Sequence, residues 1–232
     1  MSNIFKSRIA TAARSSVVAA CIGMAGVSLG FAGAASAADT GMYGNPTAAA
    51  KFWQEQTLDD CGPMSVADVV GEITGDSPTE DEIIALAEKT PSEVHPGSIY
   101  IRPTDPNDPD TFMGTNMVDL QVLLEEFGIE SVATDQGYAN EENGPETGID
   151  ALKDYLADGH KVIAVVNAET IWNSKGDRTE ADHFLVVTGI DAKKGIVHLN
   201  DSGIETGRDE QVPLATFLKA WKTSENAMVI AG

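Results

Sequence analysis

The chemistry that this sequence could perform centres on Cys61, which stands directly before an apolar run with helical periodicity. Apolar residues between positions 64 and 73 recur at three-residue steps, so one face of the expected helix is apolar. Pro63 suits the first helical turn, and Gly75 ends the run. Cys61 is therefore expected at a helix N-terminus, where unpaired backbone N–H groups and the helix dipole stabilise a thiolate.

A reactive thiolate needs a base and a group that orients the base, and the second half of the chain supplies candidates for both. His183 opens the apolar run HFLVVTGID, and its imidazole could take the thiol proton. Asp201, with Asn200 as the second choice, closes the following run and could accept a hydrogen bond from the other ring nitrogen. The amide of Gln56 and the backbone N–H of Cys61 could stabilise a developing oxyanion. The competing interpretations are a buried structural cysteine, a core histidine and a turn-forming aspartate.

In combination these segments resemble papain-like cysteine peptidases. The residues that carry the resemblance are Gln56, the sequence DCGP at Asp60–Pro63, the strand led by His183, and the pair Asn200–Asp201. The most similar type is the bacteriocin-leader-processing group, cysteine-peptidase family thirty-nine, with its secreted relatives, over roughly residues 50 to 205. The resemblance implies an α+β papain-like fold with N-terminal helices packed on a C-terminal antiparallel sheet. It also implies peptide-bond cleavage by the cysteine, histidine and aspartate, with the glutamine as oxyanion donor.

The chain departs from the family pattern at two positions. The family usually has its glutamine six residues before the cysteine, whereas this chain has Gln56 at five and Gln54 at seven. The family's aspartate usually precedes a proline, but Asp201 precedes Ser202. Both glutamines remain candidates for the oxyanion donor, and Asn200 remains an alternative to Asp201.

The elements that must position these residues follow from periodicity and turn signals. Helices are expected after Cys61, after a capping-box signature at Ser77–Glu80, after Thr115 and after Thr147. Strands are expected over residues 129–134, 161–166, 183–190, 196–201 and 228–231, and a helix or helical loop over 212–221. Residues 91–115, 135–146 and 167–182 are polar and are expected to be loops. Helices dominate the first half and strands the second, which is typical of an α+β domain.

The N-terminus has the pattern of a secretory signal peptide over residues 1–37. Three basic residues precede an apolar stretch rich in alanine and glycine, and the stretch ends in the small residues Ala35–Ala37. A lipid anchor on Cys21 is the alternative, but most of the apolar stretch follows that cysteine. Residues 38–50 lack periodicity and are expected to form a flexible lead-in to one domain over residues 51–232. Cleavage near Ala37 would leave Cys61 as the single cysteine of a secreted protein, so no internal disulfide could form.

Composition excludes several kinds of partner. The formal net charge of −21 argues against nucleic acid and anionic membrane surfaces. No stretch after residue 37 is long and apolar enough for a membrane span. Cysteine and histidine lack the spacing of a metal site, and no cofactor is expected. The expected partner is a peptide or protein substrate, and the oligomeric state stays open.

Two other functions remain compatible with these residues. The first is a cell-wall amidase or endopeptidase on a similar thiol scaffold, which differs from a peptidase in its substrate. The second is a secreted interaction module that keeps the papain-like scaffold without activity, as the displaced glutamine would allow.

Overall fold

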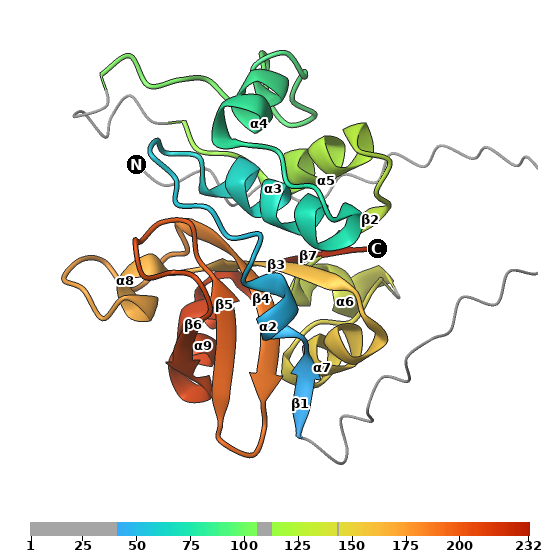
Figure 1. Cartoon of the computed structure of the whole chain (residues 1–232), viewed down its shortest axis with the longest axis vertical. Coiled ribbons are helices and arrows are strands. Elements are labelled where there is room, and N and C mark those ends of the chain that lie inside the picture. The colour runs from blue at the N-terminus through green and yellow to red at the C-terminus, as the bar shows by residue number, and fades with distance from the viewer. Residues whose placement is uncertain (1–40, 106–112, 143) are drawn as a thin grey trace, which may run out of the picture.

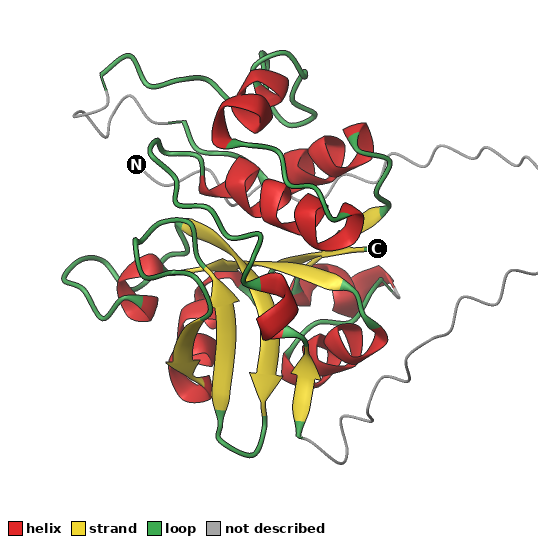
Figure 2. Cartoon of the chain, viewed as in Figure 1, coloured by secondary structure: helices red, strands yellow, loops and turns green. Residues whose placement is uncertain are grey.

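A computed structural model describes residues 41–105, 113–142 and 144–232 of the chain. A curved antiparallel sheet runs through the middle of the domain, and helices cover both of its faces (Figures 1 and 2). The expected α+β arrangement, with N-terminal helices packed on an antiparallel sheet, is confirmed. Helices on the second face of the sheet are an addition to that expectation.

Among the described residues, seven strands form the sheet, and each pairs antiparallel with its neighbours. Their order is β2-β7-β3-β4-β5-β6, and β1 pairs with the C-terminal end of β4. The two central strands are near-continuous apolar runs because both of their faces are covered. The bounds are β1 Met42–Gly44, β2 Ser131–Thr134, β3 Lys161–Val166, β4 His183–Asp191, β5 Ile196–Asn200, β6 Glu210–Pro213 and β7 Met228–Ala231.

The alternation of side chains along the central strands divides the core into two layers. Ile163 and Val165 of β3 join the layer under the N-terminal helices, whereas Val162 and Ala164 join the layer on the opposite face. The first layer packs against α3 (Cys61–Thr74), α4 (Glu80–Ala87) and α5 (Met117–Glu126). The second packs against α7 (Ile149–Asp158) and α9 (Leu214–Trp221). The sheet is thus sandwiched, and α3 lies directly over β4 (Figure 1).

Helix α3 begins at Cys61, as the sequence predicts. Its N-cap is Asp60, and its end is set by Gly75 in the left-handed conformation with φ of 86°. The side chains from Met64 to Val70 are all buried, because α3 lies between the sheet on one side and α4 and α5 on the other. The apolar face therefore fixes the helix on the sheet and places its N-terminal residue over the start of β4.

Three local predictions are wrong within the described ranges. Residues 42–44 of the expected lead-in form β1, because an unpaired edge of β4 accepts them as a strand, and Pro46–Ala49 form α2. Two expected loops contain helices, α6 (Gln136–Glu142) and α8 (Ala168–Ile171). The capping box of α4 lies two residues later than predicted: Thr79 and Glu82 bond reciprocally. A 3₁₀ helix, η2 (Lys222–Ser224), follows α9.

The predicted signal peptide, residues 1–37, and Cys21 lie outside the described residues. Among the helices within the described ranges, none combines the length and apolar character that crossing a bilayer requires.

Candidate active site

Cys61 meets His183 at the contact between α3 and β4. The cysteine is a partly exposed free thiol, whereas the histidine side chain is only 5% exposed. Cys61 is close enough to His183 to be one of the groups that raise the pKa of its ring. The structure thus brings together two residues that are 122 positions apart in the sequence.

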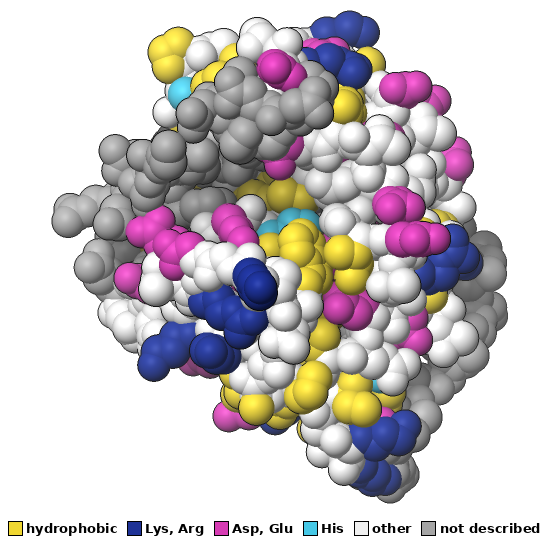
Figure 3. All heavy atoms as spheres, turned by 90° about the vertical axis from the view of Figure 1, so that its left-hand side faces the viewer, with side chains coloured by type: hydrophobic (Ala, Val, Ile, Leu, Met, Phe, Trp, Pro, Cys, Tyr) yellow, Lys and Arg dark blue, Asp and Glu magenta, His cyan; other side chains and the backbone are white. Residues whose placement is uncertain are grey.

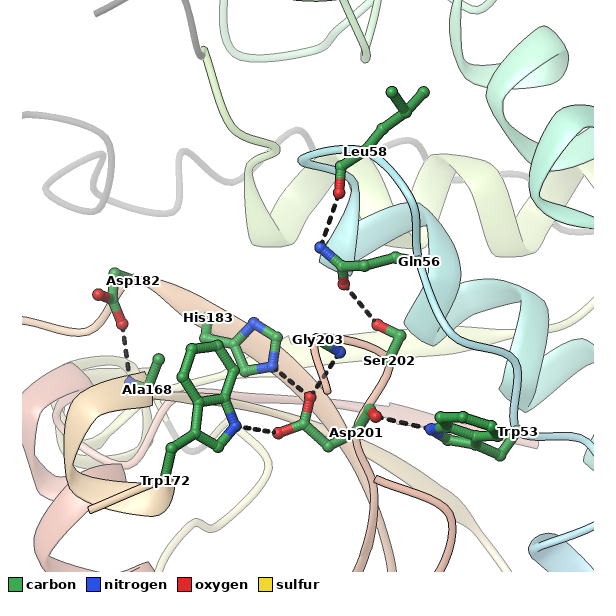
Figure 4. A network of polar contacts seen from close by, with 10 residues as sticks. All are labelled: Trp53, Gln56, Leu58, Ala168, Trp172, Asp182, His183, Asp201, Ser202 and Gly203. Carbon is green, nitrogen blue, oxygen red and sulfur yellow. Dashed lines mark hydrogen bonds and ion pairs between the residues drawn. The ribbon is translucent and has the colours of Figure 1, made fainter. Parts of the chain in front are cut away.

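The other side of the His183 ring is held by a carboxylate (Figure 4). Nε2 of His183 donates to Oδ1 of Asp201 at 2.7 Å, which leaves Nδ1 as the ring nitrogen for the thiol. Asp201 accepts two further hydrogen bonds: from the Trp172 indole on Oδ2 and from the Gly203 backbone N–H on Oδ1, each at 2.8 Å. Its side chain is fully buried. Three donors therefore fix the carboxylate, and the carboxylate in turn fixes the ring.

Burial and charge oppose each other at this pair. Burial alone would lower the pKa of His183, but the Asp201 carboxylate and Cys61 outweigh it and raise that pKa well above its usual range. Burial would likewise raise the pKa of Asp201, yet its attraction to His183 and its hydrogen bonds hold the pKa below its ordinary value. The charged forms of His183 and Asp201 thus stabilise each other. A stabilised imidazolium is one half of the thiolate–imidazolium pair that a cysteine nucleophile needs.

Asn200 faces away from the histidine. Its side-chain amide donates to the Ala49 carbonyl at 3.1 Å and to Oδ2 of Asp68 at 2.8 Å. Its side-chain oxygen accepts from the backbone N–H of Asp209 at 3.3 Å. Of the two candidates for orienting His183, the structure brings Asp201 to the ring and uses Asn200 to join α2, α3 and β5.

The two candidate glutamines point to different sides of the segment before α3. Gln54 donates to Oγ of Ser77 at 3.1 Å and to the Pro78 carbonyl at 2.9 Å, which directs it toward the start of α4. Gln56 is bonded to Ser202, whose hydroxyl donates to Oε1 of Gln56 at 2.7 Å (Figure 4). The Gln56 side chain is therefore bonded to the loop that carries Asp201, whereas the Gln54 amide is bonded to residues before α4.

Two acidic residues directly precede the thiol. Burial raises the pKa of Asp59, and the attraction of His183 partly offsets the effect. Asp60 is 1% exposed, and neither of its carboxylate oxygens has a hydrogen-bond partner among the described residues. Burial first, then Glu80 and Asp59, raise the pKa of Asp60 to about 7. Asp60 thus carries less negative charge near the thiol at neutral pH than its residue type suggests.

Three site residues were missed from the sequence: Trp172, Trp53 and Gly203. The Trp172 ring lies against His183 with centroids 5.1 Å apart, in addition to its bond to Asp201. The Trp53 indole donates to the Asp201 carbonyl at 2.6 Å. A Cβ at Gly203 would lie 2.8 Å from the Trp172 ring and 3.0 Å from Cε1 of His183, so the site has no room for a side chain there. No local pattern links positions 53 or 172 to 201, so only the folded chain reveals these contacts.

On the face that carries α8, histidine and apolar side chains gather near the middle of the surface (Figure 3). Acidic side chains border them, and a group of Lys and Arg side chains lies below. Within the described parts of the chain, no three His, Cys, Asp or Glu residues are grouped so that they could hold a metal ion.

Comparisons with known proteins identify the family and the fold. The profile of the Peptidase_C39 like family matches residues 45–229. Proteins of Mycobacterium tuberculosis and Mycobacterium bovis, both described as uncharacterized, are 49% identical over 230 residues, which cover 97% of this chain and 98% of theirs. A crystal structure described as a C39-like peptidase from Bacillus anthracis shares the fold, with a TM-score of 0.55 and 15% identity over 82% of this chain and 97% of that one. The chain therefore belongs to the Peptidase_C39 like family, and it is a peptidase-like hydrolase with a papain-like fold.

Proposed function

We propose that this protein is a secreted cysteine peptidase that cleaves peptide bonds through Cys61, His183 and Asp201. One observation carries the proposal: a buried histidine is held by a carboxylate at Nε2 and interacts with the free thiol of Cys61. The family membership supports the same reaction class. Gln56 is proposed as the side-chain donor to the oxyanion, together with the backbone N–H of Cys61.

The reaction begins with transfer of the thiol proton to His183, which gives a thiolate–imidazolium pair. The sulfur attacks the carbonyl carbon of the substrate, a C–S bond forms, and the carbonyl oxygen becomes an oxyanion. His183 then gives its proton to the amine as the C–N bond breaks, which leaves a thioester on Cys61. Water, with its proton taken by His183, hydrolyses the thioester and releases the acid and the free thiol.

Direct tests of this proposal are hydrolysis of a mixed peptide library and labelling by iodoacetamide. Wild-type protein should cleave peptides, Cys61→Ala should not, and His183→Ala should lose on the order of a hundredfold in rate. Iodoacetamide should label Cys61 faster in folded wild-type protein than in folded His183→Ala, because the imidazole takes the thiol proton. If Cys61 in the folded protein is alkylated no faster than in unfolded protein, and no peptide is cleaved, the protein is an inactive interaction module.

The chain offers a matched control for the histidine. His198 on β5 forms a second His–Asp pair, with Nδ1 at 2.7 Å from Oδ1 of Asp209, although the Asp209 side chain is 35% exposed. His198→Ala removes the same side chain and the same kind of contact, so it should affect stability but leave turnover per folded molecule unchanged. Peptidoglycan fragments are tested as a second class of substrate. Cleavage there, without cleavage of peptides, would assign a cell-wall amidase or endopeptidase.

Secretion is part of the proposal and is supported by the sequence pattern of residues 1–37. Expression of the full chain in a bacterial host with N-terminal sequencing of the exported product should give a mature start near Ala38. A product that begins at Cys21 and carries lipid would contradict this and would indicate a membrane-anchored form.

A further inference from the structure

Three hydrogen bonds join the segment before the cysteine helix to the aspartate loop, and Figure 4 draws the two that involve the Trp53 and Gln56 side chains. The Trp53 indole donates to the Asp201 carbonyl at 2.6 Å, and the Gln56 backbone N–H donates to the Ser202 carbonyl at 2.9 Å. The third bond runs between side chains, from the Ser202 hydroxyl to Oε1 of Gln56 at 2.7 Å. Ser202 therefore contacts Gln56 through both its backbone and its side chain, across 146 positions of sequence.

These contacts determine which way the Gln56 amide faces. The Leu58 carbonyl, which can only accept, takes a hydrogen bond from Nε2 of Gln56 at 2.9 Å. The Ser202 hydroxyl donates to the opposite end of the same amide. A side-chain amide nitrogen carries two N–H groups, and the described residues provide an acceptor for one of them. The second N–H has no acceptor among the described residues, and Ser202 and Leu58 together set its orientation.

Ser202 is well placed for this role because it is nearly buried, with 7% exposure. The preceding residue, Asp201, holds His183, so two neighbouring residues of one loop contact the base and the glutamine respectively. The other end of the glutamine segment is tied down independently, since Glu80 accepts from the Thr57 hydroxyl at 2.8 Å and from the Leu58 N–H at 3.2 Å. The backbone around Gln56 is thus held on both sides, and the Ser202 hydroxyl adds the contact to the amide itself.

We propose that Ser202 is a positioning residue whose hydroxyl orients the Gln56 amide toward the oxyanion formed at Cys61. This inference rests on the proposed peptidase function. It gives the 201–203 loop two tasks: Asp201 orients the base, and Ser202 orients the oxyanion donor. A donor helps only if it already points at the developing charge, so loss of the hydroxyl should slow steps that form an oxyanion and spare steps that do not.

Two reagents separate these steps without knowledge of the natural substrate. Iodoacetamide alkylates Cys61 by displacing iodide, and no oxyanion forms. Acylation by p-nitrophenyl acetate passes through a tetrahedral oxyanion and releases p-nitrophenolate as the thioester forms. The ratio of the acylation rate to the alkylation rate therefore reports the oxyanion donor, while the alkylation rate alone reports the thiolate–imidazolium pair.

Ser202→Ala should lower that ratio about fivefold to tenfold, the effect of one lost hydrogen bond, with alkylation unchanged within about twofold. Gln56→Ala should lower it further, by roughly a hundredfold. Adding Ser202→Ala to Gln56→Ala should cause no additional loss, because the hydroxyl acts through the amide. Ser202→Thr, which keeps a hydroxyl, should restore most of the ratio, and thermal unfolding identifies folded variants.

A second serine–glutamine contact on the other side of the same segment serves as the control. Ser77 accepts from Gln54 at 3.1 Å and donates to the Ala67 carbonyl at 2.7 Å. Ser77→Ala should lower stability and leave the ratio unchanged. If Ser77→Ala lowers the ratio as much as Ser202→Ala does, the effect is a general loosening of the segment and the inference is wrong.

The remaining outcomes also decide the question. An unchanged ratio in folded Ser202→Ala, an equal loss of acylation and alkylation, or a further loss on top of Gln56→Ala would each overturn the role of Ser202. Wild-type protein whose thiol reacts with both reagents no faster than unfolded protein would overturn the proposed function itself. That result is distinguishable because it appears before any variant is compared.

Discussion

Nε2 of His183 lies 2.7 Å from Oδ1 of Asp201, and the two side chains are 5% and 0% exposed. A buried ionic contact of this kind couples the protonation of both groups to folding. The raised pKa of His183 contributes stability that is fully present below the ordinary histidine pKa of about 6.5 and is lost as pH rises through the raised value. The lowered pKa of Asp201 contributes stability above the ordinary aspartate pKa of about 3.9, which is lost as pH falls through the lowered value.

Asp201→Asn should lower the pKa of His183, because the carboxylate is the strongest influence that opposes burial at the ring. An NMR titration of the His183 ring in both proteins measures the change directly. The alkaline limb of peptide hydrolysis should move to lower pH with it, since His183 must be protonated to release the amine. Turnover should fall on the order of a hundredfold. An unchanged ring titration would show that Asp201 does not stabilise the imidazolium.

Asn200→Ala should affect folding more than chemistry. The amide bonds to Ala49, Asp68 and Asp209 in a buried position, and its removal leaves those partners without it. We expect a loss of roughly 1–3 kcal/mol in the free energy of unfolding, measured by urea denaturation. Turnover per folded molecule should stay within a fewfold of wild type. A loss of turnover that matches Asp201→Ala, with stability intact, would reassign the orienting role to Asn200.

Trp172→Phe separates the two contacts of the indole. Phenylalanine keeps a ring against His183 but lacks the N–H that donates to Oδ2 of Asp201. We expect turnover to fall about tenfold, the effect of one charge-assisted hydrogen bond, and to fall further in Trp172→Ala, which also exposes the histidine to water. Turnover of Trp172→Phe equal to wild type would show that the indole acts through packing alone.

Gly203→Ala should disable the site with little change elsewhere. The added Cβ would lie 2.8 Å from the Trp172 ring and 3.2 Å from Oδ1 of Asp201, so the ring, the carboxylate or the loop must shift. Because catalysis depends on sub-ångström placement, we expect a loss of roughly a hundredfold in turnover. Turnover close to that of wild type, with thermal unfolding unchanged, would mean that the loop can move without harming catalysis.

Asp60→Asn should change the pH dependence of stability. Burial raises the pKa of Asp60 to about 7, so wild-type protein loses stability as pH rises from about 4 to about 7, where the folded state holds a proton that the unfolded state has released. The variant has no such carboxyl and keeps a residue suited to the N-cap position. The gain in unfolding free energy from the substitution should therefore grow over this pH range, by on the order of 1–3 kcal/mol. If the gain in unfolding free energy does not depend on pH, the Asp60 carboxylate is solvated and its pKa is not raised by burial.

The sequence alone determined the elements that carry the chemistry. The apolar periodicity after Cys61, with Pro63 and Gly75 at its ends, predicts α3 and its start. The continuous apolar run after His183 predicts β4, since a strand covered on both faces needs apolar side chains on both. These patterns are local, because each follows from how one segment must bury its own surface. They suffice for the fold class and for proposing the cysteine and the histidine.

Only the tertiary structure decided which of the neighbouring candidates contacts His183 and which contacts the loop after β5. Asn200 and Asp201 are neighbours with similar side chains, and they are separated because consecutive residues at a strand end point in opposite directions. Gln54 and Gln56 differ through partners at positions 77 and 202, which no local pattern connects to them. Strand β1 forms because an edge of β4 is open to it. Each of these outcomes depends on a hydrogen-bond partner far away in the sequence, and short-range periodicity contains no information about such partners.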